Sequence, residues 1–209
     1  MVVELDIPFR GLLAGLIIAA PVGPVNVFCI QNTLEKGWRS GLLSGLGAAM
    51  ADTMYGAIAG FGISFVIHFL IGEEFWFRLI GGLLLMAVGV VYYFKPPKAR
   101  RTGADVTAGH TDFVSAFLLN VSNPTTVLSF LAVLATLGLG KHRVFWESSL
   151  LVASIFCGSM AWWLTLVAAA NRFRSGVSDR IMQRMNHVAG IAIGGFGLVN
   201  VVLSRGLRH

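Results

Sequence analysis

Charged side chains are scarce in this sequence. Asp, Glu, Lys and Arg make up only 12% of its 209 residues, whereas 56% are hydrophobic. A soluble globular domain carries about 25% charged residues, which cover its water-facing surface. The charges that are present gather between long uncharged runs instead of recurring along one helix face. This distribution excludes an ordinary soluble fold and predicts an integral membrane protein.

Cysteine is also rare, and clusters of metal-ligating residues are not apparent. The two cysteines, Cys29 and Cys157, have no second cysteine and no basic residue in their own runs, so neither is placed to form a reactive thiolate. Soft metal ions favour Cys and His clusters, and hard ions favour several carboxylates. A transmembrane thiol/disulfide redox carrier and a metal-ion exporter therefore stay as alternatives. We expect no enzyme activity, metal or cofactor.

Six runs are long enough to cross a bilayer. A hydrocarbon core about 30 Å thick takes roughly 20 helical residues, and residues 74–78 complete the short third run at its membrane edge. The runs are Gly11–Leu34, Ser40–Gly72 (broken only by Asp52 and His68), Leu79–Phe94, Phe113–Gly140, Ser148–Asn171 and Met185–Ser204. Strands of a membrane barrel need only ~10 residues and alternate with a period of two. The sequence therefore predicts an all-α membrane protein of six transmembrane helices in one domain, residues 1–209.

The positive charge sets the expected orientation. The formal net charge is +6, but the basic residues lie in short loops beside apolar runs, which indicates cytoplasmic loops and not a nucleic-acid surface. Ten Lys and Arg residues follow the first, third and fifth runs, and six lie on the other side. We therefore place both termini outside.

The number of helices suggests an internal repeat. Six helices divide into two sets of three, and an odd number per half gives related halves opposite orientations. The half-repeats would span about 9–94 and 113–204, joined by a cytoplasmic loop at 95–112. When the halves are aligned, Asp52 of the second helix falls opposite Ser159 of the fifth. We predict a 3+3 inverted repeat with broken helices one and four.

The prolines predict those breaks. Proline removes a backbone donor and clashes with the preceding turn, so Pro21 and Pro24, with Gly23 between them, will unwind helix one; Asn123–Pro124 lies at a corresponding depth in helix four. Backbone groups freed in a bilayer must be satisfied by protein, water or ligand, and a new half-helix points its positive end at the break. This predicts a substrate site for a carboxylate, with Asn26 and Asn123 as ligand candidates. A kink that only shapes packing is the alternative.

Asp52 is conspicuous as the only acid between Arg39 and Glu73. Burying its charge at mid-membrane costs on the order of 2.5–3.5 kcal/mol on insertion scales. Tyr55 lies three residues on, so the same helix face presents a hydroxyl beside the acid. We predict that Asp52 couples protons and binds the substrate together with Tyr55 and Ser159. The alternative is an inter-helix hydrogen bond that serves packing alone.

Small residues recur at four-residue spacing inside the runs. Such pairs let helices approach closely and also allow a homodimer. The pairs are Gly11 and Gly15, Gly41 and Gly45, Gly56 and Gly60, and Gly190 and Gly194. Trp162 and Trp163 lie in mid-run, where packing is favoured over lining a cavity.

Several segments in order carry a family resemblance. They are the break at Pro21–Pro24, Gln31–Gly41, Gly45–Asp52, Gly81–Gly89, Ser122–Pro124, Gly158–Trp163, Met185–Gly190 and Gly194–Gly197. Together they resemble the lysine exporter (LysE/RhtB-type) family of amino-acid efflux transporters over nearly the whole chain. The resemblance implies a secondary transporter of the bacterial cytoplasmic (inner) membrane that exports amino acids or related small metabolites in exchange for protons.

The family's motifs fall on a small set of positions in this chain. By position they are Pro21, Gly23, Pro24, Asp52, Asn123 and Pro124. One departure concerns the first break, because Val22 separates Pro21 from Gly23 where the family usually has an uninterrupted Pro-Gly-Pro. The asparagine that often follows directly is displaced to Asn26. The resemblance therefore does not imply lysine as the substrate.

Overall fold

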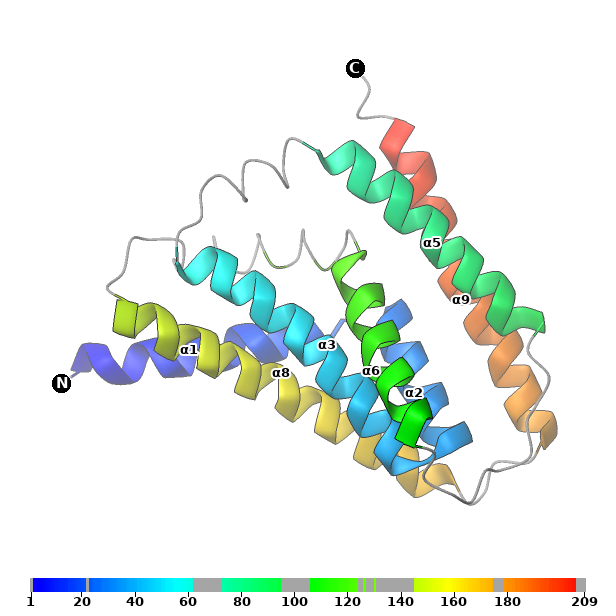
Figure 1. Ribbon diagram of the computed structural model, residues 1–209, viewed down its shortest axis with the longest axis horizontal. Helices are drawn as coiled ribbons and strands as arrows, with labels where there is room; N and C mark the ends of the chain where they lie inside the picture. Colours follow the sequence, from blue (N-terminus) through cyan, green and yellow to red (C-terminus); the bar gives the residue numbers. More distant parts are fainter. Residues whose placement is uncertain are drawn as a thin grey trace.

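The computed structural model describes residues 2–21, 23–61, 73–94, 106–123, 126, 130, 145–174 and 179–205. Within these residues the chain forms seven helices and no strand (Figure 1), which confirms the all-α class. The helices are α1 (Val2–Ala19), α2 (Pro24–Lys36), α3 (Trp38–Gly60), α5 (Glu74–Phe94), α6 (Val106–Val121), α8 (Phe145–Phe173) and α9 (Asp179–Arg205).

The first predicted run is two helices and not one. α1 ends at Ala19 and α2 begins at Pro24, which takes the first-turn position where a missing N–H costs nothing. The axes of Asp6–Ala19 and Pro24–Lys36 differ in direction by 80°. Gly23, the residue before α2, is extended and gives the helix no side-chain cap. A break therefore occurs where the two prolines predicted it.

The other helix bounds follow the apolar runs with some differences. α3 covers the first part of the second run as far as Gly60, and residues 62–72 lie outside the described residues. α6 begins at Val106, inside the segment that the sequence predicted as a loop at 95–112. The end of an apolar run marks where a helix leaves the hydrocarbon core, but backbone hydrogen bonds can continue the helix into the polar region. α6 therefore extends beyond its apolar run.

Two described helices are long and apolar enough to cross a membrane by length and composition. They are Phe145–Phe173 and Gln183–Ser204, and the bent pair α1 and α2 makes a third if it counts as one span. Arg78–Val91 of α5 is apolar but shorter. Among the described residues this test therefore finds two spans, or three with the bent pair, which supports a membrane protein and leaves the six predicted spans unconfirmed.

The helices pack in pairs, and glycines make the closest approaches. α1 lies along α8, α3 packs on both α6 and α8, and α5 pairs with α9 (Figure 1). A Cβ atom on Gly15 would lie 2.2 Å from the Ile155 carbonyl oxygen, and one on Gly158 would lie 2.1 Å from that of Leu12. Gly190 meets the backbone of α5 in the same way. The glycine pairs therefore serve close helix packing, as predicted.

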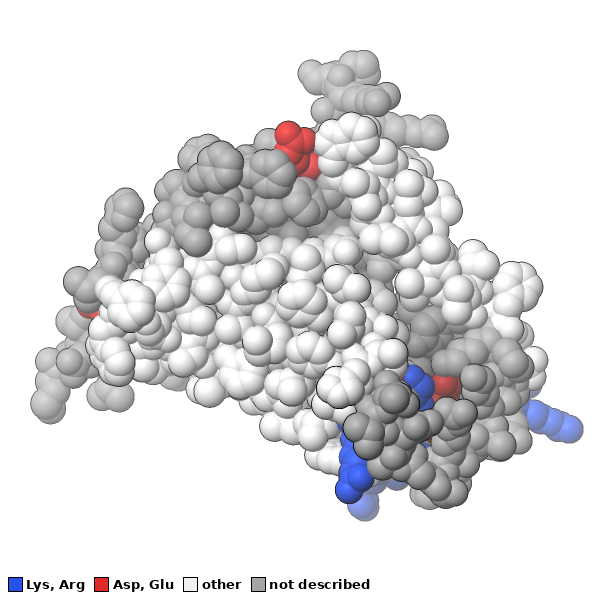
Figure 2. Space-filling view, in the orientation of Figure 1, with Lys and Arg blue, Asp and Glu red and all other residues white. Residues whose placement is uncertain are grey.

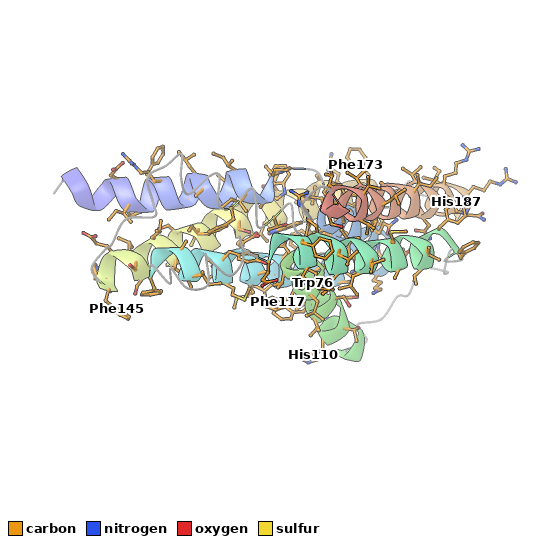
Figure 3. The ribbon with its side chains drawn as sticks, turned by 90° about the horizontal axis from the view of Figure 1, so that it is seen from above. Trp76, His110, Phe117, Phe145, Phe173 and His187 are labelled. Carbon is orange, nitrogen blue, oxygen red and sulfur yellow. The ribbon has the colours of Figure 1, made fainter. Side chains whose placement is uncertain are left out.

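The polarity of the bundle is reversed relative to a soluble protein. Large apolar side chains such as Phe145, Phe173 and Trp76 are exposed on its outside (Figure 3), while Asp52 and Asn120 are buried. Figure 2 shows an extensive uncharged surface, with Lys and Arg gathered at one end. α2 and α8 end at this end of the bundle and α9 begins near it (Figure 1), and we call it the basic end. It carries Lys36, Arg39, Arg172, Arg174, Arg180 and Arg184.

Candidate functional site

Asp52 lies where α3 packs against both α6 and α8, and its side chain is only 1% exposed. The Asn120 amide of α6 donates to Asp52 Oδ1 over 2.9 Å. The Ser159 hydroxyl of α8 donates to Oδ2 over 2.5 Å. Both donors among the described residues are neutral, so the carboxyl group has hydrogen bonds but no fixed ion pair. That leaves it free to exchange a proton or to meet a cationic ligand.

A further set of hydrogen bonds orients these two donors. The Trp163 indole N–H donates to Ser159 Oγ over 3.2 Å, and the Thr126 hydroxyl donates to Asn120 Oδ1 over 3.0 Å. The Asn120 amide also donates to the Ala48 carbonyl over 2.9 Å. The sequence analysis did not select Asn120, Thr126 or Trp163. A signal was present, since Asn120 is a polar residue inside an apolar run and lies three residues before Asn123.

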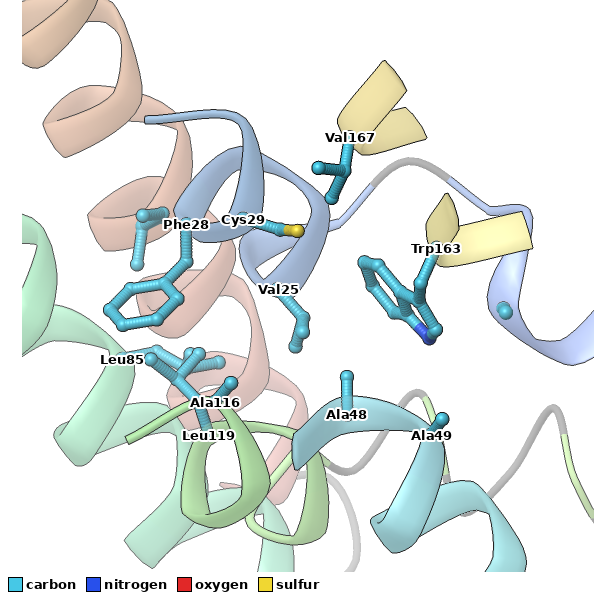
Figure 4. Close-up of a cluster of buried hydrophobic side chains, with 12 residues drawn as sticks. Val25, Phe28, Cys29, Ala48, Ala49, Leu85, Ala116, Leu119, Trp163 and Val167 are labelled. Atoms are coloured by element: carbon cyan, nitrogen blue, oxygen red, sulfur yellow. The ribbon is translucent and has the colours of Figure 1, made fainter. Parts of the chain in front are cut away.

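Small residues of α3 make room for this arrangement. A Cβ atom on Gly45 would lie 2.8 Å from the Cβ atom of Trp163, so α8 can approach this closely only beside glycine. Trp163 then packs against the methyl groups of Ala48 and Ala49 and against Val25 of α2 (Figure 4). The indole ring is 2% exposed. Trp163 therefore belongs to the core, as favoured from the sequence, and also supports the hydroxyl that contacts Asp52.

Tyr55 is directed toward the C-terminal end of α6, beside the place where the sequence predicts the second break. Its hydroxyl donates to the Val121 carbonyl over 2.8 Å, at the residue where α6 ends, and its ring packs against Phe130. Asn123, just beyond, is buried, and its backbone N–H donates to the Asn120 carbonyl. Pro124 lies outside the described residues. Tyr55 and Asn123 are thus brought to one place, at the end of α6.

Asn26 bridges the first break with both ends of its amide. Its nitrogen donates to the Pro21 carbonyl over 2.8 Å, and its oxygen accepts from the Trp162 indole over 3.1 Å. A carbonyl freed by the proline break is therefore satisfied by protein, as a buried backbone group requires. Asn26 holds the two sides of the break together, a role the sequence analysis did not foresee for it.

The two tryptophans of α8 connect the break with the acid. Trp162 donates to Asn26 at the break, and its neighbour Trp163 donates to Ser159, which contacts Asp52. α1 also borders this region, because a Cβ atom on Gly15 would lie 2.7 Å from the Ser159 backbone nitrogen. The first break and the buried acid are thus linked through adjacent residues of α8.

Replacing Trp162 with Phe removes the indole N–H but keeps an aromatic ring. Because Asn26 loses the donor to its oxygen, we expect the free energy of unfolding to fall by about 1 kcal/mol, a typical value for one hydrogen bond. Thermal unfolding of the purified protein in detergent measures the change. Trp146→Phe on the same helix is the matched control, since that ring is exposed. Equal shifts in the two variants would contradict a role for the Trp162 bond.

The cysteines do not form a pair. Cys29 is buried in α2, where its thiol donates to the Gly41 carbonyl over 3.4 Å, and Cys157 is exposed on α8. Both are free thiols. Within the described part of the chain, no group of three or more His, Cys, Asp and Glu residues could hold a metal ion. Neither the redox carrier nor the metal exporter gains support from this arrangement.

A buried acid beside a broken helix, inside a bundle with an apolar exterior, is the arrangement found in secondary transporters. The comparison with family models is consistent with this class. Residues 16–204 match the family described as LysE type translocator, and the chain belongs to that family. The resemblance inferred from the sequence is therefore confirmed.

Two relatives in other organisms match most of the chain. The Bacillus subtilis protein described as "Putative amino acid efflux protein YcgF" is 27% identical over 191 residues, covering 89% of this chain and 90% of the relative. The Escherichia coli "Uncharacterized membrane protein YahN" is 29% identical over 190 residues, covering 88% and 82%. No solved structure matches the chain.

Proposed function

We propose that this translocator is a secondary active exporter of amino acids or related small metabolites, driven by protons that move in the opposite direction. The observation that carries the proposal is the Asp52 carboxyl group, which is buried and which, among the described residues, accepts hydrogen bonds from neutral donors of α6 and α8. The chain belongs to a family of translocators, and a buried acid inside an apolar run is a group well suited to couple transport to protons.

The relative directions of the helices support six alternating spans arranged as an inverted repeat. α1 runs parallel to α8, and α6 runs parallel to α3, whereas α3 and α8 are antiparallel, as are α5 and α9. These directions follow from the facing positions Gly11 and Leu151, Gly15 and Ser159, Ser40 and Asp112, Asp52 and Asn120, Gly45 and Trp163, and Gly82 and Gly197. In the proposed repeat α1 corresponds to α6, α3 to α8, and α5 to α9. Exchanging the two halves therefore turns the parallel pair α1–α8 into the parallel pair α6–α3. The antiparallel pairs α3–α8 and α5–α9 each stay the same pair.

The contact between Asp52 and Ser159 fits the same symmetry. The alignment of the halves made these residues equivalent, and equivalent positions meet where a two-fold axis passes between two helices. Their 2.5 Å hydrogen bond joins α3 and α8, the pair that the exchange maps onto itself. The proposed axis would therefore pass beside the acid, which places the substrate site between the two halves.

In this proposal the substrate is held at both of its charged groups. Its carboxylate meets the N-terminus of α2, which has no side-chain cap, and the half-helix that the sequence predicts after Pro124. Its ammonium group meets ionised Asp52 on the cytoplasmic side of the cycle. Protonation of Asp52 from outside releases the ammonium group, and the neutral acid returns inward and loses its proton. One proton enters for each substrate molecule that leaves.

The proposed orientation places the basic end in the cytoplasm of a bacterial inner membrane and both termini outside. This follows from the excess of Lys and Arg at the loops of that end. A reporter fused after His209 that is active only in the periplasm should be active, and a reporter active only in the cytoplasm should be silent.

Transport by the purified protein tests the proposal. Proteoliposomes are loaded with one radiolabelled amino acid at a time, from a panel with aliphatic, hydroxyl, acidic and basic side chains. With the outside acidic, we expect faster efflux of at least one member than from protein-free liposomes, together with acidification of the lumen reported by a trapped pH dye. Efflux that ignores the pH gradient would contradict antiport, and no efflux of any member would overturn amino-acid export.

A further inference from the structure

A second buried acid lies at the basic end, far from Asp52 along the chain. Asp112 of α6 is 3% exposed and accepts hydrogen bonds at both carboxylate oxygens. The Lys36 ammonium group contacts Oδ1 as an ion pair, and the Ser40 hydroxyl donates to Oδ2. The Asn32 amide donates to Oδ1 over 3.5 Å. We call these four residues the Asp112 cluster.

The Asp112 cluster joins the two halves of the chain. Lys36 and Asn32 belong to α2 and Ser40 to α3, both in the first half, whereas Asp112 belongs to α6, the first helix of the second half. A buried ion pair is weak evidence for net stability, because desolvation offsets most of the attraction, but removing one partner alone is strongly unfavourable. Such a pair therefore holds two elements in one defined arrangement.

The Asp112 cluster closes one end of a continuous seam that leads to Asp52. On α3 the seam consists of Ser40, Ser44, Ala48 and Asp52, and on α6 it consists of Asp112, Ala116 and Asn120; members are four residues apart and all are buried. At 1.5 Å rise per residue, Ser40 and Asp52 are roughly 18 Å apart along the helix. The Asn32 amide also donates to Ser44 Oγ over 2.9 Å, next to the ion pair. The seam thus runs from the basic end to the proposed substrate site.

The half-helix α2 is separated from its neighbouring helices by a change in backbone direction at each end. The proline break precedes it, and Gly37 follows it with φ at +100°, a conformation that residues with side chains rarely adopt. Lys36 is the last residue of α2 and is therefore at the point where a pivot about the break produces the largest movement. Arg174, the residue after α8, makes a second contact with this end of α2, because its Nε donates to the Leu34 carbonyl over 3.2 Å.

We propose that the Lys36–Asp112 ion pair is the latch that closes the transport pathway at the basic end. In the arrangement described here the latch is formed, the seam is sealed, and Asp52 has no path along it to that end. Substrate loading from that side requires the pair to separate. The inference rests on the proposed function, since a latch has a purpose only in a protein that opens to alternate sides.

Thiol accessibility tests the latch without any need for transport. Ala116→Cys, in a Cys29→Ala and Cys157→Ala background, places one thiol a helical turn below Asp112, where Ala116 is fully buried. The protein is held in nanodiscs and treated with a cationic, water-soluble methanethiosulfonate reagent. Adding Asp112→Asn or Lys36→Gln should speed labelling at least about tenfold, equivalent to ~1.4 kcal/mol lost from the closed state.

The controls separate opening from unfolding. Arg10→Gln breaks the exposed Asp6–Arg10 pair and should leave the labelling rate unchanged. If Asp112→Asn unfolds too easily to be measured, the labelling rate of Lys36→Gln tests the latch instead. The Lys36 side chain is 34% exposed, and without it Asp112 still accepts from its other donors. Unchanged labelling in the folded variants would overturn the latch.

Labelling of the latch variants, combined with export by Asp52→Asn, distinguishes the latch from the function on which it rests. Faster labelling in the two latch variants, combined with full export by Asp52→Asn, would support the latch while contradicting the proton role of Asp52. Slow labelling in the latch variants, combined with loss of export in Asp52→Asn, would support the exporter and overturn the latch.

Discussion

Asp52→Asn is expected to abolish proton-coupled export while leaving the protein folded. The amide has nearly the shape of the carboxyl group, and its oxygen can still accept from Asn120 or Ser159, so helix packing changes little. What the substitution removes is the negative charge and the proton that it exchanges. Efflux from proteoliposomes under a pH gradient should fall to the protein-free level, and the internal dye should record no acidification.

Asp6→Asn is the matched control for this prediction. It makes the same chemical change at an exposed acid of α1, whose ion pair with Arg10 is on the surface, where such pairs contribute about 0–1 kcal/mol. Export by this variant should equal that of the unchanged protein. If Asp52→Asn also retained export with proton movement, Asp52 would be a packing residue and the coupling group would have to be sought elsewhere.

Gly15→Ala is expected to lower the stability of the bundle strongly, because the added methyl group overlaps backbone atoms of α8. The new Cβ atom would lie 2.2 Å from the Ile155 carbonyl oxygen and 2.7 Å from the Ser159 nitrogen, both rigid backbone atoms of α8. α1 and α8 must separate to relieve this overlap. Overpacking typically costs 1–3 kcal/mol, so the thermal midpoint should drop clearly, and export should fall because Ser159 contacts Asp52.

Gly195→Ala provides the contrasting control on α9. No atom lies within 4 Å of a Cβ atom built at that position, and replacing glycine by alanine within a helix gains up to about 1 kcal/mol of helix propensity. The thermal midpoint should therefore stay the same or rise. A similar loss in both variants would mean that the α1–α8 approach is not the cause.

Part of the site could be predicted because its causes are local in the chain. The break before Pro24 follows from the geometry of proline itself, and α1 does end at Ala19. Asp52 was recognisable because an acid within an apolar run is costly wherever that run packs. The family could likewise be recognised from the order of short segments, and its match over residues 16–204 confirms it.

Other parts of the site depend on contacts between distant segments. The donors to Asp52 come from residues 68 and 107 positions away, and the Lys36 partner of Asp112 is 76 positions away. Asp112 looked like the end of a loop because the apolar run begins after it, yet α6 starts earlier and buries its carboxylate. No local pattern distinguishes such an acid from an exposed one.

The sequence by itself therefore determined the class of the protein and the place of the first break, and it singled out Asp52 as an unusual acid, because charge cost and proline geometry act within a few residues. The tertiary structure decided what those residues contact. It gave Asp52 neutral donors, turned Asn26 into a bridge across the break, and paired Lys36 with Asp112. The reason is physical: burial and hydrogen bonding are properties of the packed helices, and glycines such as Gly15 set how closely those helices approach.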